Sequence, residues 1–250
     1  MDDRVRQEVD AYFAARFGLE PDFGGGTGVL VVAGRTDSPD VLLLRIGGVC
    51  VVEVAPGQLE TARQRLSGLS ADEAFTPALA LELAGPGSRA LGPSWHGYLA
   101  PATTLPERDG RVLRLPPSDR RLIALRARCD PAEWAEGGFP LDPAEVDETT
   151  TALYGFELDG ELVAAGNMTE WRGRPADVGL LTRADQRGRG LAATVAAAMV
   201  ADWLSEVGIV RYRALFTNRA SLAVAAGLGF EGHGANIVAR RRRPDARPDH

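Results

Sequence analysis

Apolar positions in the first hundred residues follow two periods, one typical of helices and one typical of strands. Val5, Val9, Phe13 and Phe17 recur every four residues, which places them on one face of a helix. Two apolar runs meet at Gly47-Gly48, a composition that favours a hairpin turn. The pattern predicts a small α/β or α+β unit without an evident catalytic cluster. Its expected helices cover residues 2–17, 58–66 and 72–83, and its strands cover residues 29–33, 41–46, 49–54 and 95–99.

The second half of the chain repeats strand-length apolar runs and adds a long amphipathic helix. Residues 101–109 contain Pro and Thr and interrupt the pattern, which predicts a linker. Asp159-Gly160 lies between two apolar runs and is a strong hairpin signal. The expected strands cover residues 111–115, 150–158, 161–168, 178–182, 211–216 and 237–239, and the expected helices cover residues 122–127, 131–134, 191–207 and 219–227. We therefore expect an N-terminal domain over residues 1–105, an α/β domain with a mixed sheet over residues 110–240, and a flexible Arg-rich tail over residues 241–250.

Composition excludes several classes of function. The net charge of −6 and the pI of about 5.2 argue against nucleic-acid binding, and the terminal arginine run is better read as a solvated tail. Apolar runs are too short to span a membrane, and the acidic, amphipathic N-terminus is unlike a signal peptide. Cys50 and Cys129 are far apart in sequence, and Cys/His clusters with metal-ligand spacing are absent. These features predict a cytoplasmic protein that needs no metal.

One stretch, Asp177–Trp203, organises the second half. An apolar strand ends at Thr182, two glycines alternate with two arginines over Arg187–Gly190, and a long helix follows. The start of a helix has unpaired amides and a partial positive charge, and glycines allow close approach to the backbone. The turn therefore predicts a cradle for an anion such as a diphosphate. A strand-to-helix turn that serves packing alone is the alternative.

The residues Arg187-Gly188-Arg189-Gly190-Leu191-Ala192 resemble the R/Q-x-x-G-x-G/A signature of the GCN5-related N-acetyltransferases (GNAT). A second block, Asn218-Arg219-Ala220-Ser221 followed by Gly229-Phe230, resembles the later N-x-x-[A/S]…G-F segment of that family. The resemblance covers roughly residues 111–240 and implies a GNAT fold that uses acetyl-CoA as co-substrate. The first hundred residues are not recognised; a degenerate GNAT-like unit is one interpretation, although a second phosphate turn is missing.

The resemblance also implies which residues hold the co-substrate. Backbone groups of the central strand would serve the thioester and the pantetheine arm, the glycine turn would hold the diphosphate, and Asn218 would reach the pantetheine or cap the following helix. The implied binding residues are Leu180, Leu181, Thr182, Arg187, Gly188, Arg189, Gly190, Leu191, Ala192, Ala193 and Asn218.

Residues for proton transfer are less well defined by the sequence. Asp177 on the central strand and Glu170 at the end of the preceding strand are the candidate bases, and ordinary exposed acids are the alternative. Many relatives carry a tyrosine at the position of Ala225, so the usual phenol is absent here. Ser221 is the candidate that protonates the thiolate or hydrogen-bonds to it, with helix packing as the alternative. A thiol is itself a good leaving group, so a dedicated acid is not required.

The acceptor is expected over residues 129–139, since the resemblance implies that the first two helices set specificity. Trp134 and Phe139 would wall an amine pocket, although a core tryptophan is the plainer interpretation. The leading hypothesis is an N-acetyltransferase acting on a small-molecule amine such as an antibiotic, a polyamine or an amino acid derivative. The alternatives are a protein N-terminal or side-chain acetyltransferase and a non-catalytic acetyl-CoA-binding sensor. The N-terminal unit would complete the pocket, form a homodimer or bind an effector.

Overall fold

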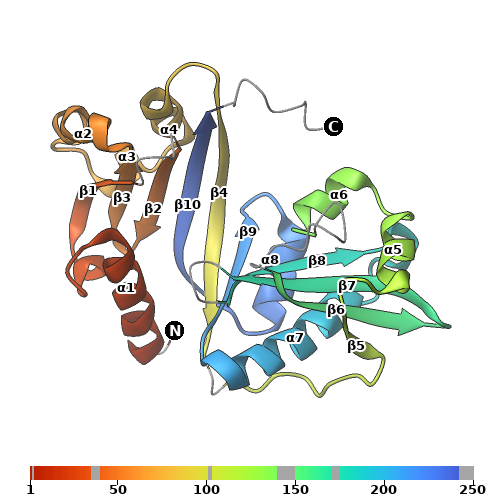
Figure 1. Ribbon diagram of the computed structural model, residues 1–250. Helices are drawn as coiled ribbons and strands as arrows, with labels where there is room; N and C mark the ends of the chain where they lie inside the picture. The colour runs from red at the N-terminus through yellow and green to blue at the C-terminus, as the bar shows by residue number, and fades with distance from the viewer. Residues whose placement is uncertain (2, 35–39, 101–102, 140–149, 171–174, 242–250) are drawn as a thin grey trace. The chain divides into compact units, whose positions relative to one another are not determined.

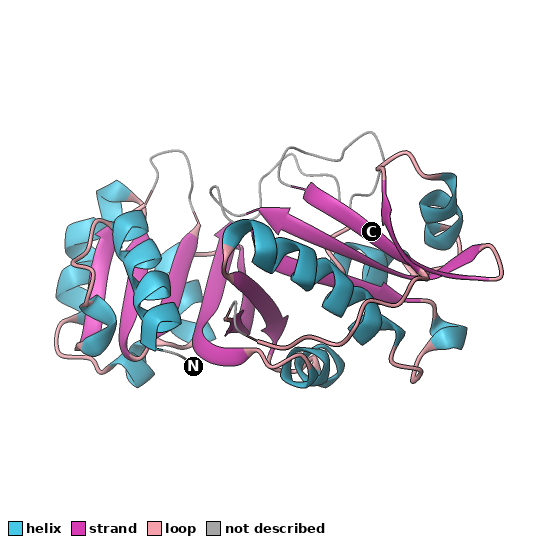
Figure 2. Ribbon diagram, turned by 90° about the horizontal axis from the view of Figure 1, so that it is seen from below, coloured by secondary structure: helices cyan, strands magenta, loops and turns pink. Residues whose placement is uncertain are grey.

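The computed structural model describes the chain except for residues 2, 35–39, 101–102, 140–149, 171–174 and 242–250 (Figure 1). Its contacts divide into two compact units. Unit 1 comprises Met1–His96, Ala214–Asn218 and Gly232–His250, and unit 2 comprises Gly97–Arg213 and Arg219–Glu231. Figure 2 shows helices lying along the strands of each unit, so the architecture is mixed α/β as expected.

Unit 1 begins with the helix predicted from the four-residue period, and Val5, Val9 and Phe13 are buried on one face of it. Its helices and strands are α1 (Asp3–Phe17), η1 (Phe23–Gly25), β1 (Thr27–Ala33), β2 (Val41–Ile46), β3 (Gly48–Val54), η2 (Pro56–Gln58), α2 (Leu59–Leu66), α3 (Ala71–Ala74), α4 (Pro77–Ala84) and most of β4 (Ser88–Leu99). The helix expected over residues 72–83 is two helices. Thr76 accepts a hydrogen bond from the Leu79 amide as the N-cap of α4, and Pro77 occupies the first helical turn, where its missing N–H costs little.

The strands of unit 1 belong to a six-stranded sheet in the order β1-β3-β2-β10-β4-β9, in which β9 is Val210–Leu215. β1 runs parallel to β3, while β2 is antiparallel to both β3 and β10 (Glu231–Arg241). Because β10 pairs with β2 from Ala235 to Ala239, the C-terminal strand groups with the N-terminal part of the chain. The compact units therefore do not follow the expected division of the sequence at residues 105–110.

Unit 2 is built on a four-stranded antiparallel sheet in the order β5-β6-β7-β8. Asp159-Gly160 joins β6 to β7 as predicted, with both residues at positive φ. Its elements are β5 (Val112–Leu115), α5 (Arg120–Arg126), α6 (Pro131–Glu136), β6 (Thr150–Leu158), β7 (Glu161–Glu170), β8 (Pro175–Thr182), η4 (Ala184–Gln186), α7 (Leu191–Val207), most of β9 (Val210–Leu215) and α8 (Arg219–Gly227).

The two faces of this sheet carry different helices. α7 packs on one face, where a Cβ added at Gly166 of β7 would lie 2.8 Å from Val195. The other face carries α5 and α6 over an apolar cluster that includes Leu122, Leu125 and Trp134. The sheet thus presents β8 with the long helix beneath it and the two short helices above it (Figure 1).

Candidate active site

The glycine turn between β8 and α7 is open toward solvent. Gly188 and Gly190 both have a φ of +75°, a left-handed conformation that L side chains rarely adopt. A Cβ added at either position would meet no atom within 4 Å among the described residues, so these glycines set the backbone path and leave space above it. Gly190 is the N-cap of α7, and its carbonyl accepts the first helical hydrogen bond, from the Thr194 amide at 3.0 Å.

The first turn of α7 fits an anion. The backbone amides before Thr194 have no acceptor within the helix, and they lie at the positive end of a 17-residue helix. They belong to Leu191, Ala192 and Ala193. Arg187 and Arg189 add formal positive charge and are exposed. The space above the glycines, the unpaired amides and the two arginines together match the chemistry of a diphosphate.

Arg187 is also tied into the protein. Its Nε donates to the Thr182 carbonyl at 3.2 Å, and its Nη2 donates to Glu133 on α6 at 2.6 Å. Arg189 donates to the side chain of Gln186 within the turn. Arg187 therefore links the turn to the end of β8 and to α6, while Arg189 makes a contact confined to the turn.

β8 lies at the edge of its sheet, and no strand among the residues that the structure describes pairs with the other side of its backbone. The next strand in the chain, β9, belongs to the other sheet. The Arg183 amide donates to Val163 at 2.9 Å, and alternate residues of an antiparallel pair face the partner strand. This alternation points the backbone groups of Leu180 and Thr182 to the open edge and those of Leu181 toward β7. The Arg187 bond to the Thr182 carbonyl agrees with this assignment.

The backbone of the loop after α6 packs closely against β8. Asn167 on β7 is 1% exposed, and its Nδ2 donates to the Gly137 carbonyl at 2.9 Å. Asn167 is the register partner of Gly179 on β8, where an added Cβ would lie 2.1 Å from that same carbonyl oxygen. Asn167 and Gly179 thereby fix the loop after α6 against the central strand. The sequence analysis did not identify Asn167, and its only signal was a single amide inside an apolar strand.

Trp134 and Phe139 lie behind this loop. Each is 3% exposed, and their ring centroids are 4.7 Å apart. Both rings belong to an apolar cluster with Leu122, Leu125 and Leu181. This placement matches the plainer interpretation, a core tryptophan, and the rings support the α6 segment from within.

Residues 120–230 match the family model described as the acetyltransferase (GNAT) family. Residues 120–230 form a GNAT acetyltransferase domain. No curated protein matches the chain in sequence.

Solved structures similar to this chain are also described as GNAT proteins. One, an acetyltransferase of Novosphingobium aromaticivorans, is 19% identical with a TM-score of 0.47, covering 63% of this chain and 69% of its own. A GCN5-related N-acetyltransferase of Kribbella flavida is 19% identical with a TM-score of 0.45, and the match covers 67% of this chain and 65% of that chain. A tandem GNAT protein from the clavulanic acid biosynthesis pathway is 18% identical with a TM-score of 0.46, and the match covers 83% of this chain and 85% of that chain.

Within the GNAT domain, Ser221 on α8 has a phenol beside it. Its Oγ lies 2.9 Å from the hydroxyl of Tyr212 on β9. Tyr212 is fully buried and packs edge-on against Phe230, with ring centroids 5.3 Å apart. Burial raises the pKa of Tyr212, an effect that the hydrogen bond with Ser221 partly offsets. A phenol thus lies beside Ser221 and comes from the neighbouring strand, a contact that the sequence analysis did not find.

The candidate bases are placed by backbone only. Asp177 lies on β8 opposite Thr169, and Glu170 lies at the end of β7 opposite Pro175, beyond a shift in register. The side chains of both acids lie outside the described part of the structure, so their roles stay predictions. Asn218 immediately precedes α8, and its amide donates to the Leu215 carbonyl at 2.9 Å.

Other kinds of site, a metal centre and a membrane span, are not found among the described residues. Among them, no group of three metal-ligating side chains comes together. No helix in this part of the chain combines the length and hydrophobicity needed to cross a bilayer. Cys50 and Cys129 are free thiols.

Proposed function

We propose that the GNAT domain transfers the acetyl group of acetyl-CoA to a primary amine of a small molecule. The observation that carries the proposal is the open turn at Gly188 and Gly190, which presents helix amides and two arginines beside the edge strand β8. The diphosphate would be held by the amides of Leu191, Ala192 and Ala193. The pantetheine amides would pair with the Leu180 and Thr182 backbone at the open edge of β8.

The proposed reaction is direct. The amine nitrogen attacks the thioester carbonyl, a C–N bond forms, the C–S bond breaks, and the amine loses a proton while the thiolate gains one. Backbone donors at the β8 edge favour the negative charge that develops on the carbonyl oxygen. The Ser221 hydroxyl, hydrogen-bonded to Tyr212, would supply the proton to the thiolate.

The acceptor would approach over the segment that Asn167 fixes, where Gly137 and Gly138 replace side chains with bare backbone. The chain's acidity and its free cysteines are consistent with a cytoplasmic protein that binds cations and not nucleic acid.

The test is a thiol-release assay with acetyl-CoA and four classes of acceptor: aminoglycosides, polyamines, amino acids and short peptides. Turnover with a small amine and none with peptides is the expected result, and turnover with peptides alone would transfer the proposal to a protein acetyltransferase. Acetyl-CoA that raises the melting temperature without any turnover would favour the non-catalytic sensor.

The base is tested separately by comparing Asp177→Asn and Glu170→Gln across pH. The variant that loses the acidic limb of the kcat/KM profile identifies the base. If both variants keep that limb, neither carboxylate takes the proton.

A further inference from the structure

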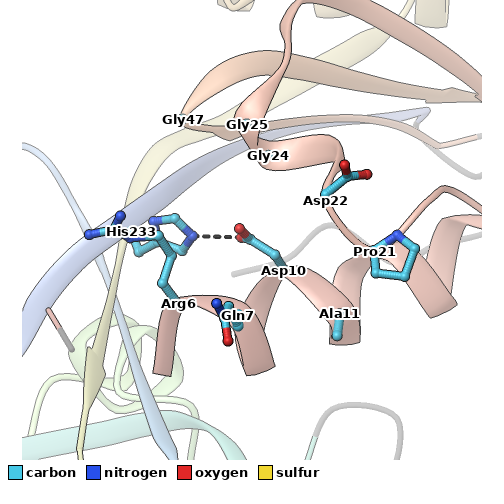
Figure 3. A pocket seen from close by; sticks show the side chains of 10 residues that line it. All are labelled: Arg6, Gln7, Asp10, Ala11, Pro21, Asp22, Gly24, Gly25, Gly47 and His233. Atoms are coloured by element: carbon cyan, nitrogen blue, oxygen red, sulfur yellow. Dashed lines mark hydrogen bonds and ion pairs between the residues drawn. The ribbon is translucent and has the colours of Figure 1, made fainter. Parts of the chain in front are cut away.

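Unit 1 contains a cavity whose lining residues all belong to that unit. Its volume is about 740 Å³, within the range of sites for small organic ligands. It lies between α1, the segment around η1, and β10 (Figure 3). Much of its wall is small or apolar, from Ala11, Pro21, Gly24, Gly25 and Gly47.

A nearly buried acid–histidine pair stands at this cavity. Asp10 is only 9% exposed although it belongs to the amphipathic helix α1. His233 on β10 donates from Nε2 to Asp10 Oδ1 at 2.7 Å. Burying a carboxylate is costly unless it is paired, so the fold keeps Asp10 at the cavity with a dedicated partner.

The second oxygen of Asp10 lies against glycine backbone. A Cβ added at Gly24 would lie 2.9 Å from Asp10 Oδ2, and one added at Gly47 would lie 2.5 Å from the Gly24 carbonyl oxygen. Two glycines are therefore needed for the backbone to come this close to the carboxylate. Among the described residues, no donor makes a hydrogen bond to Oδ2, whereas Oδ1 accepts one from His233.

Charges of both signs border the cavity. Figure 3 shows Arg6 and His233 on one side of Asp10 and the carboxylate of Asp22 on the other. Arg6 has an exposed ion pair with Asp3 at 3.4 Å, which is weak enough to exchange. Asp22 is exposed, and its carboxylate has no ion pair or side-chain hydrogen bond in the described part of the chain. Asp10 and Asp22 would repel a dianion, and Arg6 would repel a polycation. The charges around the cavity therefore suit a ligand that carries one charge of each sign.

We propose that this cavity binds a free α-amino acid. The ligand's ammonium group pairs with the carboxylates of Asp22 and Asp10, and its carboxylate pairs with the guanidinium of Arg6. The small and apolar wall receives a short side chain. The site would make unit 1 an amino-acid-binding module, independent of whether the GNAT domain turns over.

The experiment is calorimetric titration of the whole chain, without acetyl-CoA, by each of the twenty amino acids. We expect at least one to bind with a stoichiometry of one. Arg6→Ala and Asp22→Asn should each weaken that binding tenfold or more, and both side chains are exposed, so the variants should fold. Arg4→Ala on the same helix and Glu20→Gln near Asp22 are the matched controls, and they should stay within twofold of the parent.

Two derivatives of the bound amino acid test the need for both charges. The N-acetyl derivative lacks the ammonium group and the carboxamide lacks the carboxylate, and each should bind at least tenfold more weakly. The proposal is overturned if none of the twenty amino acids binds at 10 mM, if Arg6→Ala and Asp22→Asn bind like the parent, or if either derivative binds as well as the amino acid. Binding that is insensitive to both variants would instead indicate acceptor binding at the GNAT domain.

Discussion

Arg187 of the glycine turn donates to the carboxylate of Glu133 on α6 at 2.6 Å. One arginine thus belongs to two regions with different proposed roles, because the turn is proposed to hold the diphosphate and α6 lies on the acceptor side. A diphosphate bound at the turn would compete with Glu133 for this guanidinium. If the turn holds the diphosphate as proposed, the ion pair would oppose co-substrate binding and would couple it to the position of α6.

Glu133→Gln should strengthen acetyl-CoA binding. Both side chains are nearly half exposed, so the pair contributes only about 0.2–1 kcal/mol, and the expected fall in Kd is about 1.5- to 5-fold. Titration of coenzyme A at low salt measures it, because salt screens the competition. Glu136→Gln removes a charge from the same helix, and the Glu136 side chain has no ion pair among the described residues, so this variant should leave the Kd unchanged. Equal effects of the two variants would mean that general charge, and not the Arg187 pair, is responsible.

Gly190→Asp should abolish coenzyme A binding while Gly190→Asn should retain much of it. Both residues tolerate the left-handed conformation at a φ of +75°, and no described atom lies within 4 Å of the added Cβ. The two variants are alike in shape and differ in charge, so their difference isolates the repulsion between the aspartate and the diphosphate. We expect the Kd of Gly190→Asp to exceed that of Gly190→Asn by at least tenfold. Similar Kd values for the two variants would place the diphosphate elsewhere.

Gly179→Ala should destabilise the protein, because its Cβ would lie 2.1 Å from the Gly137 carbonyl oxygen and 2.6 Å from the Asn167 amide. Forced packing of this kind typically costs about 1–3 kcal/mol. Gly227→Ala at the end of α8 is a matched change with the opposite expectation, since an added Cβ there meets nothing within 4 Å and alanine favours a helix over glycine by at most about 1 kcal/mol. Urea unfolding of both variants measures the difference, and a stable Gly179→Ala would show that the α6 segment is free to move away.

Tyr212→Phe and Ser221→Ala test the proposed proton donor. The phenyl ring keeps the packing against Phe230, so Tyr212→Phe removes the hydroxyl alone. If Ser221 and Tyr212 protonate the thiolate together, each variant should lower kcat by at least tenfold, and the double variant should lower it little further. Because the pKa of Tyr212 is raised, its phenol stays protonated through pH 9, and the parent should show no loss of kcat from this group below that pH. Unchanged kcat values in both variants would mean that the thiolate needs no acid.

Sequence reasoning located the elements and the turn more readily than the contacts across them. The α1 face, the Asp159-Gly160 hairpin and the glycine turn follow from spacing and residue type, which are local properties. Other contacts join residues that are far apart in the chain, such as the pairing of β10 with β2 and the hydrogen bond from Asn167 to Gly137. The local pattern of one sequence does not indicate which distant segments come together. Tyr212 was overlooked for the same reason, since only the fold brings β9 beside Ser221.

Alkaline pH should destabilise unit 1 through Cys50, which is fully buried on β3. Burial raises the pKa of this thiol from 9.0 to about 12, with Arg45 opposing the shift. The folded state therefore holds the proton more tightly than the unfolded state, so the stabilisation is complete below pH 9 and is lost as pH rises from 9 to 12. The expected slope is about 1.4 kcal/mol per pH unit for this one group, added to that of the tyrosines.

Urea unfolding at pH 8 and pH 10.5 measures this loss of stability. Cys50→Ala should be less stable than the parent at both pH values but should lose less stability between them. A parallel loss in parent and variant would show that Cys50 ionises as easily in the folded chain as in the unfolded one.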